Sequence, residues 1–404
     1  MKMPTSSHRP SHRTTLVATL IASGCSLAGS ALATQGTFPH GYGVKSEGMG
    51  GAGIALAQDG LAGATNPAGM VEVGNRLDLG AAFLKVDNGS RFGSTRFDGS
   101  ADKSLYVIPQ LGANRMLDDA SAIGLSVVGN GVGTAYRHSD DIGGLRGPRS
   151  ELKQMVATAS YARKLDEANA IGAGLVLARQ VLTIHGPGGL GLPEGRDESY
   201  GAGVRLGWTG HLGFGLSLGA AYASRIRMSR MDEFRGLLAE HGDLDVPANY
   251  GAGIAWRIGA TTLAVDYLRI EWSDVRSLGN PGVTSADGPP GSREGPGFGW
   301  RDQSVWRVGI AHAVTDALTL RAGYNHGTKL LDPRDGFLGV LAPSANRRHA
   351  TLGASYALAK GTELSVAYAR SFKETVHGQG PAPDGITDLY MGQHWLSVAY
   401  GVRF

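Results

Sequence analysis

A glycine-rich stretch near the N-terminus, EGMGGAGIALAQDGLAGATNPAGM from Glu47 to Met70, contains a spacing that some proteins use to hold phosphate. Gly48, Gly50 and Gly53 form the pattern G-x-G-x-x-G. In a dinucleotide-binding fold this pattern follows a buried strand, opens a helix and precedes an acidic residue by about 20 positions. Here no apolar strand precedes it, and Asp59 comes six positions after Gly53. The stretch therefore predicts no phosphate site, and its glycines need another explanation.

Hydrolytic or metal-dependent chemistry would need serine, histidine and acidic residues in recognisable groups. The chain has 12 histidines, and His312, His349 and His394 fall on separate predicted strands without a nearby serine nucleophile turn. No H-E-x-x-H motif occurs. The only cysteine, Cys25, lies in a predicted signal peptide, so the mature chain has no thiol for catalysis or metal binding. We expect no enzyme activity, no cofactor and no metal.

Three arginines, Arg205, Arg307 and Arg321, fall on the polar faces of predicted strands, as do Asp266 and Glu363. An arginine can hold a carboxylate through charge-assisted hydrogen bonds. Such residues can equally pair with one another or with a neighbouring segment. Binding of a ligand carboxylate and internal pairing both remain open at this point.

The elements that carry these residues are predicted to be strands. Beyond residue 75, segments of about 10 residues alternate apolar and polar side chains with period two, which is typical of a transmembrane β-barrel. In TELSVAYARSF, for example, Leu364, Val366, Tyr368 and Arg370 point one way. The pattern predicts an all-β fold of 14 antiparallel strands, at 76–87, 104–116, 121–136, 153–165, 170–182, 199–210, 213–226, 247–258, 261–273, 301–314, 317–327, 347–358, 362–372 and 391–404.

The connections and the aromatic residues support a barrel rather than a soluble sandwich. Tight turns alternate with long loops, an asymmetry typical of outer-membrane barrels with periplasmic turns and external loops. Aromatic side chains fall on apolar faces towards the ends of segments, as membrane-interface girdles require: Tyr161, Trp208, Tyr222, Trp256, Tyr324, Tyr356, Tyr368 and Tyr400. The last strand ends on Phe404, which resembles the C-terminal signal read by the outer-membrane assembly machinery.

The N-terminus predicts export. Residues 1–33 contain a basic end, an apolar stretch and the small-x-small sequence Ala31-Leu32-Ala33, which is typical of a cleaved signal peptide. A lipoprotein alternative through Cys25 lacks the large aliphatic residue expected three positions before the cysteine. The net charge of +3 gives no reason to expect nucleic acid as a partner. We expect the mature chain to reside in the outer membrane of a Gram-negative cell.

Residues 34–75 precede the first strand, and their sequence resembles the N-terminal hatch of FadL-type outer-membrane transporters. The most specific element is Asn66-Pro67-Ala68 after Asp59, together with the upstream glycines. The resemblance continues through YVIPQLGANRML, GLSVVGNGVGT, VPANYGAGIAWR, LAVDYLRIEWSDV and WRVGIAHAVTDALTLRAGYN. It implies a monomeric barrel of residues 76–404 whose lumen holds the 34–75 segment as a plug of short helices. Its implied partners are a fatty acid or hydrocarbon, membrane lipid and lipopolysaccharide, and the barrel assembly machinery.

The resemblance also implies a path for the ligand. A kink in the third strand would open the wall sideways, and Gly129, Asn130, Gly131 and Gly133 supply a glycine density that permits a bulge or bend. Alternatively these glycines only relieve crowding against the plug. In the fourth external loop, residues 231–241 predict an amphipathic helix whose apolar face forms either a ligand-capture groove or a rim contact: Met231, Phe234, Leu237 and Leu238.

Two other functions fit a barrel. A porin-like channel would carry polar solutes through an open constriction without a complete plug, and a receptor or adhesin would act through its external loops. The sequence therefore favours a hatch-gated transporter of hydrophobic molecules, with a solute channel or surface receptor as the alternative.

Overall fold

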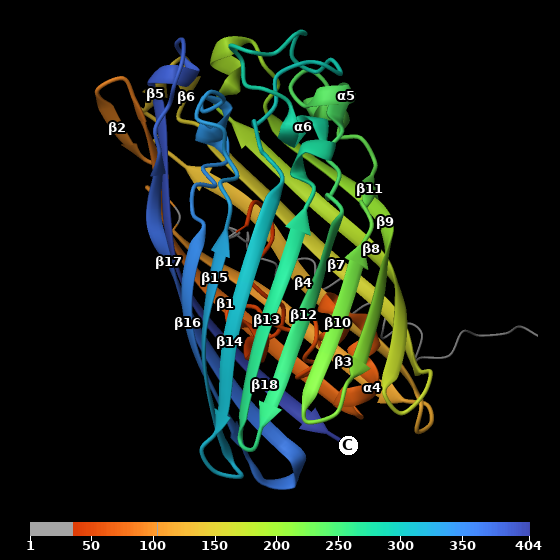
Figure 1. Ribbon diagram of the computed structural model, residues 1–404. Coiled ribbons are helices and arrows are strands. Elements are labelled where there is room, and N and C mark those ends of the chain that lie inside the picture. The colour runs from red at the N-terminus through yellow and green to blue at the C-terminus, as the bar shows by residue number, and fades with distance from the viewer. Residues whose placement is uncertain (1–34, 103) are drawn as a thin grey trace, which may run out of the picture.

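The main feature of the fold is a tilted cylinder of β-strands around short N-terminal helices (Figure 1). The computed structural model describes residues 35–102 and 104–404, so the predicted signal peptide and Cys25 lie outside the described residues. The predicted all-β barrel of 14 strands is confirmed, and its strands are β1 (Arg76–Phe92), β3 (Leu105–Met116), β4 (Ser121–Ala135), β7 (Arg149–Lys164), β8 (Asn169–His185), β9 (Gly195–His211), β10 (Leu216–Ala223), β12 (Asn249–Ile258), β13 (Thr261–Ile270), β14 (Gln303–Ala313), β15 (Leu318–Gly327), β16 (Arg348–Ala357), β17 (Thr362–Val376) and β18 (Thr387–Arg403).

The barrel closes through antiparallel pairs. Each wall strand pairs with its neighbour in sequence, and β1 pairs with β18 to complete the ring. Closure gives every wall strand a neighbour on both sides, which lets the backbone satisfy its hydrogen bonds within lipid. Short strands decorate the loop end: β2 (Thr95–Asp98), β5 (Asp141–Ile142), β6 (Leu145–Arg146) and β11 (Arg227–Met228). Connections at the other end, the turn end, hold two to four residues, such as 117–120 and 259–260.

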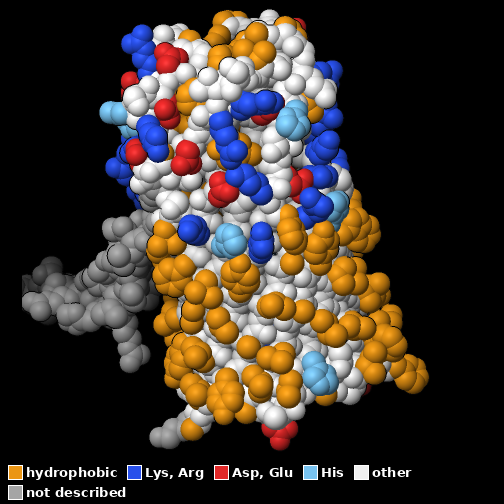
Figure 2. All heavy atoms as spheres, turned by 90° about the vertical axis from the view of Figure 1, so that its left-hand side faces the viewer, with side chains coloured by type: hydrophobic (Ala, Val, Ile, Leu, Met, Phe, Trp, Pro, Cys, Tyr) orange, Lys and Arg blue, Asp and Glu red, His pale blue; other side chains and the backbone are white. Residues whose placement is uncertain are grey.

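The outer surface carries an apolar belt, and Figure 2 shows it below a zone rich in charged side chains. On β16, Leu352 and Tyr356 are exposed while Thr351 and Ser355 face inward and are buried. The predicted girdle residues other than Trp208 are exposed, and Trp208 is half-buried. Among the described residues, no helix is long and apolar enough to cross a membrane.

The N-terminal plug, residues 35–75, lies within the cylinder and is almost entirely buried (Figure 1). It contains α2 (Val44–Glu47), α3 (Ala62–Thr65), η1 (Pro67–Gly69) and α4 (Met70–Val73). Other short helices lie in the loops and in one turn: η2 (Pro187–Leu190), η3 (Asp232–Phe234), α5 (Ala239–Gly242), η4 (Trp272–Asp274), α6 (Arg276–Gly279), η5 (Leu338–Leu341), η6 (Ala359–Gly361) and η7 (Asp384–Ile386). The plug and the loops therefore bound the space in which a ligand could pass.

Candidate transport path

Hydrogen bonds join the plug to the wall on several sides. The Asp266 carboxylate on β13 accepts from the backbone N–H groups of Gly53, at 2.7 Å, and Ile54, at 3.0 Å. On β16, the Thr351 hydroxyl accepts from Gly50 N–H at 2.8 Å and donates to the Gly48 carbonyl at 3.0 Å. A buried backbone group without a hydrogen-bond partner costs free energy. Each wall residue that bonds to such a group therefore holds one plug segment in place.

The Asn66-Pro67-Ala68 segment makes a turn that is tied to the wall. The Asn66 amide nitrogen donates to the carbonyls of Ile54, at 2.8 Å, and Trp208, at 3.0 Å. Its side-chain oxygen caps η1 by accepting from Ala68 N–H at 3.1 Å, and Pro67 occupies the first position of that helix, where no N–H is needed. The segment thus connects two parts of the plug to β9.

The glycine pattern of the plug is a packing feature. A methyl group on Gly50 would lie 2.7 Å from the Tyr324 carbonyl oxygen, and a Cβ on Gly48 would lie 3.0 Å from Gly353. The wall supplies glycines in return, and a side chain on any of them would strike the plug: Gly112, Gly172, Gly207, Gly219, Gly253, Gly309, Gly323 and Gly353. Plug and wall therefore approach backbone to backbone, which explains why both sides are rich in glycine.

Ion pairs join the plug to β1 and β17. Lys45 lies 2.6 Å from Glu363, and Glu363 also lies 3.5 Å from Arg76, which pairs with Asp78 at 2.6 Å. Asp78 accepts from Gly60 N–H at 2.7 Å, beside the buried Asp59, whose carboxylate accepts from Leu61 N–H. This charged cluster fixes the middle of the plug.

The three arginines predicted to face the lumen do so, and each contacts the plug. Arg205 donates to the Thr65 carbonyl at 3.3 Å, and Arg307 donates to the Gly51 carbonyl at 3.3 Å. Arg321 donates to the Gln58 side chain at 3.3 Å and to Ser355 at 2.8 Å. Their guanidinium groups take part in holding the plug, and a role in carboxylate binding stays a prediction.

β4 separates from β3 halfway along its length. The β3–β4 ladder runs from Met116 and Ala122 to Gln110 and Val128 and stops there, although both strands continue. From Val128 to Ala135 every β4 residue is buried, so the alternation between faces disappears over Gly129, Asn130, Gly131 and Gly133. The β4–β7 ladder continues to Ala135 without a register shift. The segment Val128–Ala135 therefore keeps one neighbour and lacks β3 on its other edge.

That edge of β4 contacts the plug instead. Gly131 N–H donates to the Thr37 carbonyl at 3.0 Å, and the Tyr42 hydroxyl donates to the Asn130 side chain at 3.1 Å. From β1, the Asn88 amide donates to the Gly133 carbonyl at 3.1 Å. Backbone groups that a β3 ladder would satisfy are thus met partly by the plug and partly by the chain after β2, where the Gly99 carbonyl accepts from Ala135 N–H.

In loop 4 (224–248), the predicted helix over residues 231–241 is wrong. The structure has the three-residue η3 and the four-residue α5, and Glu240 and His241 adopt left-handed φ angles of 52° and 60°. Their N–H groups donate to Ser292 and Gly291 carbonyls in loop 5 (271–302), so contacts between loops replace helical hydrogen bonds. The apolar residues named for this helix are nonetheless buried together: Met231, Phe234, Leu237 and Leu238.

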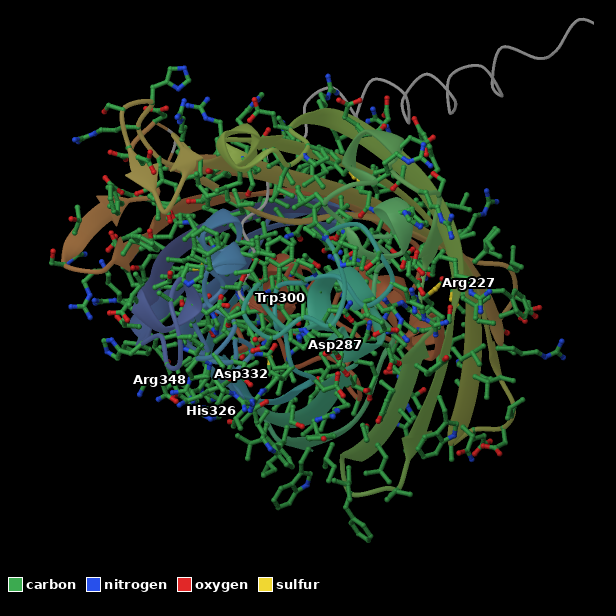
Figure 3. All side chains as sticks on the ribbon, turned by 90° about the horizontal axis from the view of Figure 1, so that it is seen from above. Arg227, Asp287, Trp300, His326, Asp332 and Arg348 are labelled. Carbon is green, nitrogen blue, oxygen red and sulfur yellow. The ribbon has the colours of Figure 1, made fainter. Side chains whose placement is uncertain are left out.

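A small apolar cavity of about 30 Å³ lies between the upper part of β4 and the external loops. Its lining has no charged residue and comes from the plug, three strands and loops 4, 5 and 6 (328–347): Thr37, Val132, Ser150, Leu152, Leu182, Ile184, Leu238, Leu244, Leu278, Phe298, Trp300, Leu341 and Ala342. Trp300 lies near the middle of the barrel mouth in Figure 3. A dry cavity of about 150 Å³ can bind benzene, so this one must expand to hold a ligand.

Sequence patterns predict few of these lining residues. Phe298 and Trp300 lie in the irregular stretch GPGFGWRD, which has neither strand nor helix periodicity. Only the residue types indicated a role, because large apolar side chains in a long external loop are expected to pack against another surface. The lining comes from seven regions, the plug, three strands and three loops, and their meeting in space could not be derived from spacing.

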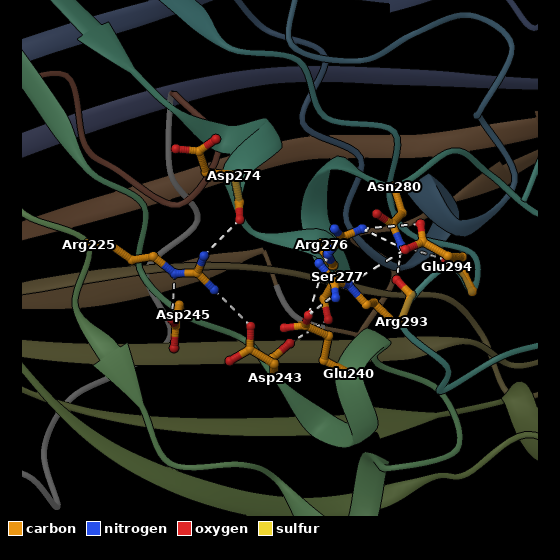
Figure 4. A network of polar contacts seen from close by, with 11 residues as sticks. Arg225, Glu240, Asp243, Asp245, Asp274, Arg276, Ser277, Asn280, Arg293 and Glu294 are labelled. Atoms are coloured by element: carbon orange, nitrogen blue, oxygen red, sulfur yellow. Dashed lines mark hydrogen bonds and ion pairs between the residues drawn. The ribbon is translucent and has the colours of Figure 1, made fainter. Parts of the chain in front are cut away.

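A polar network ties loop 4 to loop 5 (Figure 4). Arg225 pairs with Asp245 at 2.5 Å and Asp243 at 3.0 Å, and donates to the Asp274 carbonyl at 2.8 Å. Arg276 pairs with Glu240 of loop 4 at 3.4 Å and with Glu294 of its own loop at 3.1 Å. Burial, reinforced by the nearby Asp245 carboxylate, raises the pKa of Asp243 to about 6. The loops are therefore connected by charges whose balance depends on pH.

The sequence also contains one serine motif at the β9–β10 hairpin. GLSLG, from Gly215 to Gly219, matches G-x-S-x-G, and Ser217 lies 2.9 Å from His211, which contacts Glu72 at 3.3 Å. The serine of a hydrolase elbow sits on a sharp strand-to-helix turn. Ser217 instead faces His211 across the β9–β10 hairpin, and Glu72 is a plug residue. The group is a further contact between plug and wall.

Comparison with known proteins identifies the family. The chain matches the model described as Outer membrane protein transport protein (OMPP1/FadL/TodX) over residues 27–384. It belongs to this family. The chain is thus an outer-membrane transport protein and not an enzyme, as expected, and the resemblance drawn from the sequence is confirmed. No curated protein sequence matches the chain.

Solved structures of this OMPP1/FadL/TodX family share the fold. The P. putida toluene transporter TodX is 19% identical, with a TM-score of 0.71 over 90% of this chain and 99% of its own. The Ralstonia pickettii toluene transporter TbuX is 19% identical, with a TM-score of 0.67 over 90% and 99%. A Pseudomonas aeruginosa FadL homologue is 19% identical, with a TM-score of 0.69 over 93% and 100%.

Proposed function

We propose that the protein is a monomeric channel that carries hydrophobic molecules, hydrocarbons or long-chain fatty acids, into the cell by passive diffusion. The observation that supports this most directly is the uncharged apolar cavity under loops 4, 5 and 6. A charged solute would lose its hydration there without gaining a countercharge, whereas an apolar one has no such hydration to lose. The toluene transporters and the monoaromatic hydrocarbon channel among the similar structures agree with such a ligand.

The gate in this proposal is the plug, and Thr37 is the residue that couples it to the ligand. Thr37 lines the cavity, and its carbonyl accepts the hydrogen bond from Gly131 on β4. A ligand that expands the cavity must displace Thr37 and therefore weakens that bond. The plug body, with Gly48, Gly50 and Gly53, would stay anchored at lower levels while its first residues move.

The exit is between β3 and β4, above Gln110 and Val128. No ladder joins these strands there, and displacement of Thr37 and Tyr42 would remove plug contacts from the edge of β4. A ligand leaving at this point enters the hydrocarbon layer without crossing water. Transfer from one apolar environment to another requires no energy source, which agrees with passive diffusion.

Neutral ligands suit this path better than carboxylates. The cavity contains no cation, and the lumen arginines Arg205, Arg307 and Arg321 already donate to plug or wall groups. A buried carboxylate without a partner is strongly disfavoured. We therefore place uncharged hydrocarbons ahead of fatty acids as substrates.

Uptake measurements test the proposal. A strain that lacks the protein would be complemented with the wild type or with one of two variants. Leu278→Asp places a charge in the cavity, and the control Leu190→Asp places one at an exposed position in the loop of residues 186–194. We expect toluene uptake to be restored by the wild type and the control and to be lost with Leu278→Asp. Unchanged uptake of both toluene and oleate on complementation would reject the proposal. A large open current from the intact protein in planar bilayers would favour the porin-like alternative.

A further inference from the structure

The outward face of β17, β18 and β1 carries a row of basic side chains at the loop-end edge of the apolar belt. Arg370 is the cross-strand partner of His394, and His394 is the partner of Lys85. All three are exposed. Neighbouring strands lie about 4.8 Å apart, so the row spans roughly 10 Å. Figure 2 shows Lys, Arg and His side chains side by side along this edge.

The row directly below it is apolar. Tyr368, Leu396 and Phe83 are cross-strand partners in the same order, and each is exposed on the outer face. The Tyr368 hydroxyl lies 2.7 Å from Nδ1 of His394. When the hydroxyl donates to Nδ1, the Nε2–H of His394 is a free donor. The surface therefore offers donors above a hydrocarbon-compatible strip.

Nearby charges leave this row with an excess of cations. Lys373 pairs with Asp87 at 2.8 Å, and Arg348 pairs with Glu374 at 2.8 Å. In the described part of the chain, neither Arg370 nor Lys85 has an ion pair, and the Arg370 guanidinium lies 5.9 Å from the Phe372 ring. The register shift in β17 between Ser371 and Glu374 allows Phe372 and Lys373 to join this surface.

We infer that Lys85, Arg370 and His394 form a binding site for the phosphate of a lipid in the outer leaflet. Long loops of an outer-membrane barrel face the cell exterior, so the row lies at the level of the outer-leaflet head groups. Arg and Lys bind phosphate through charge-assisted hydrogen bonds, and acyl chains would lie along Phe83, Leu396 and Tyr368. The lipid with this chemistry is a phosphorylated glycolipid, the lipid A part of lipopolysaccharide. The site lies on the wall outside the transport path and does not depend on the transported ligand.

Native mass spectrometry of the full-length mature protein in detergent tests this inference with purified bisphosphorylated lipid A as the probe. We expect the wild type to retain a bound lipid A molecule, and Lys85→Gln with Arg370→Gln to weaken binding about tenfold or more for each cation removed. The matched control is Arg115→Gln with Arg163→Gln, two exposed arginines towards the turn end. It should bind lipid A as the wild type does, and Arg370→Lys should retain binding.

The ligand itself provides a second arm that needs no variant. Lipid A without phosphates should bind the wild type about tenfold more weakly, because the proposed site recognises the phosphate. Equal binding of dephosphorylated lipid A, full binding by the Lys85 and Arg370 double variant, or equal loss in the turn-end control would each overturn the site. The heat-dependent gel shift of a folded barrel shows that every variant compared is folded.

Discussion

The plug and the external loops both close the same barrel, but they do so with different forces. Plug contacts are polar and directional, as in the two N–H groups held by Asp266 and the two bonds made by Thr351. Loop side chains that line the cavity are mostly apolar, and the Trp272 and Trp300 rings of loop 5 have centroids 5.1 Å apart. Ion pairs of Arg225 and Arg276 also hold the loops. Hydrogen bonds lose most of their strength when their geometry changes, whereas apolar surfaces can slide and repack at lower cost.

This difference assigns separate tasks to the two regions. An apolar ligand can replace loop side chains in the cavity, because it offers the remaining side chains an apolar surface of the same kind. It cannot replace the partners of buried plug amides. Recognition is therefore expected in the loops, and exclusion of water and ions in the plug.

Removal of the plug should have the largest effect on conductance. A mature protein without residues 35–75 keeps all 14 wall strands and loses every contact between plug and wall. We expect a large, steady current in planar bilayers, whereas the intact protein should give little. A current of equal size from the intact protein would contradict the role of the plug and favour a porin-like channel.

A single methyl group should disturb the plug where backbone meets backbone. A Cβ on Gly323 would lie 2.2 Å from both Gly50 N and Met49 C, whereas a Cβ on Gly53 meets nothing closer than 3.4 Å. Gly323→Ala should destabilise the seated plug by about 1–3 kcal/mol, the usual cost of overpacking. Bilayer recordings should show frequent opening for Gly323→Ala and none for the control Gly53→Ala. Equal behaviour would mean that the plug shifts freely.

The comparison also explains which features the sequence could predict. Alternation with period two follows from the pleat of a strand between lipid and lumen, so the strands and the inward direction of Arg205, Arg307 and Arg321 were predictable. Their partners were not, because Thr65, Gly51 and Gln58 reach them only through the path of the plug. The glycine spacing of the plug predicted no phosphate site, but the close contacts with the wall that explain it required the structure.

The helix prediction for loop 4 was wrong for a different physical reason. Apolar spacing over residues 231–241 fits a helix, and burial of Phe234 and Leu238 shows that the apolar character was meaningful. The backbone nevertheless follows loop 5, since Glu240 and His241 donate to its carbonyls in left-handed conformations. Contacts between loops that are distant in sequence decided the local structure, and these contacts leave no periodic signal.

A smaller effect is expected from one hydroxyl group. Thr351→Val keeps the shape of the side chain but removes both the acceptor for Gly50 N–H and the donor to the Gly48 carbonyl. The loss should weaken plug seating by about 1–3 kcal/mol, because two buried backbone groups lose their partner. Thr319→Val, on the lumen face of β15, is the control, since in the described residues the Thr319 side chain has no hydrogen bond to the plug. Brief channel openings in Thr351→Val alone would show that these two hydrogen bonds help to seat the plug. Their absence would mean that water replaces the hydroxyl.

The smallest effect concerns the pH dependence of the loop network. The pKa of Asp243 is raised to about 6 by burial and by Asp245, from an ordinary value near 3.8. Its protonated form is therefore favoured in the folded loops, and the resulting stabilisation is fully present below about pH 3.8 and is lost as pH rises through about 6. Hydrogen exchange of residues 239–247, corrected for the intrinsic effect of pH, should show protection falling between pH 4.5 and 7.5 in the wild type. Asp243→Asn should abolish this change, while Asp232→Asn, at an exposed site of the same loop, should retain it. If Asp243→Asn retains the full pH dependence, groups other than Asp243 control the response of the loops to pH.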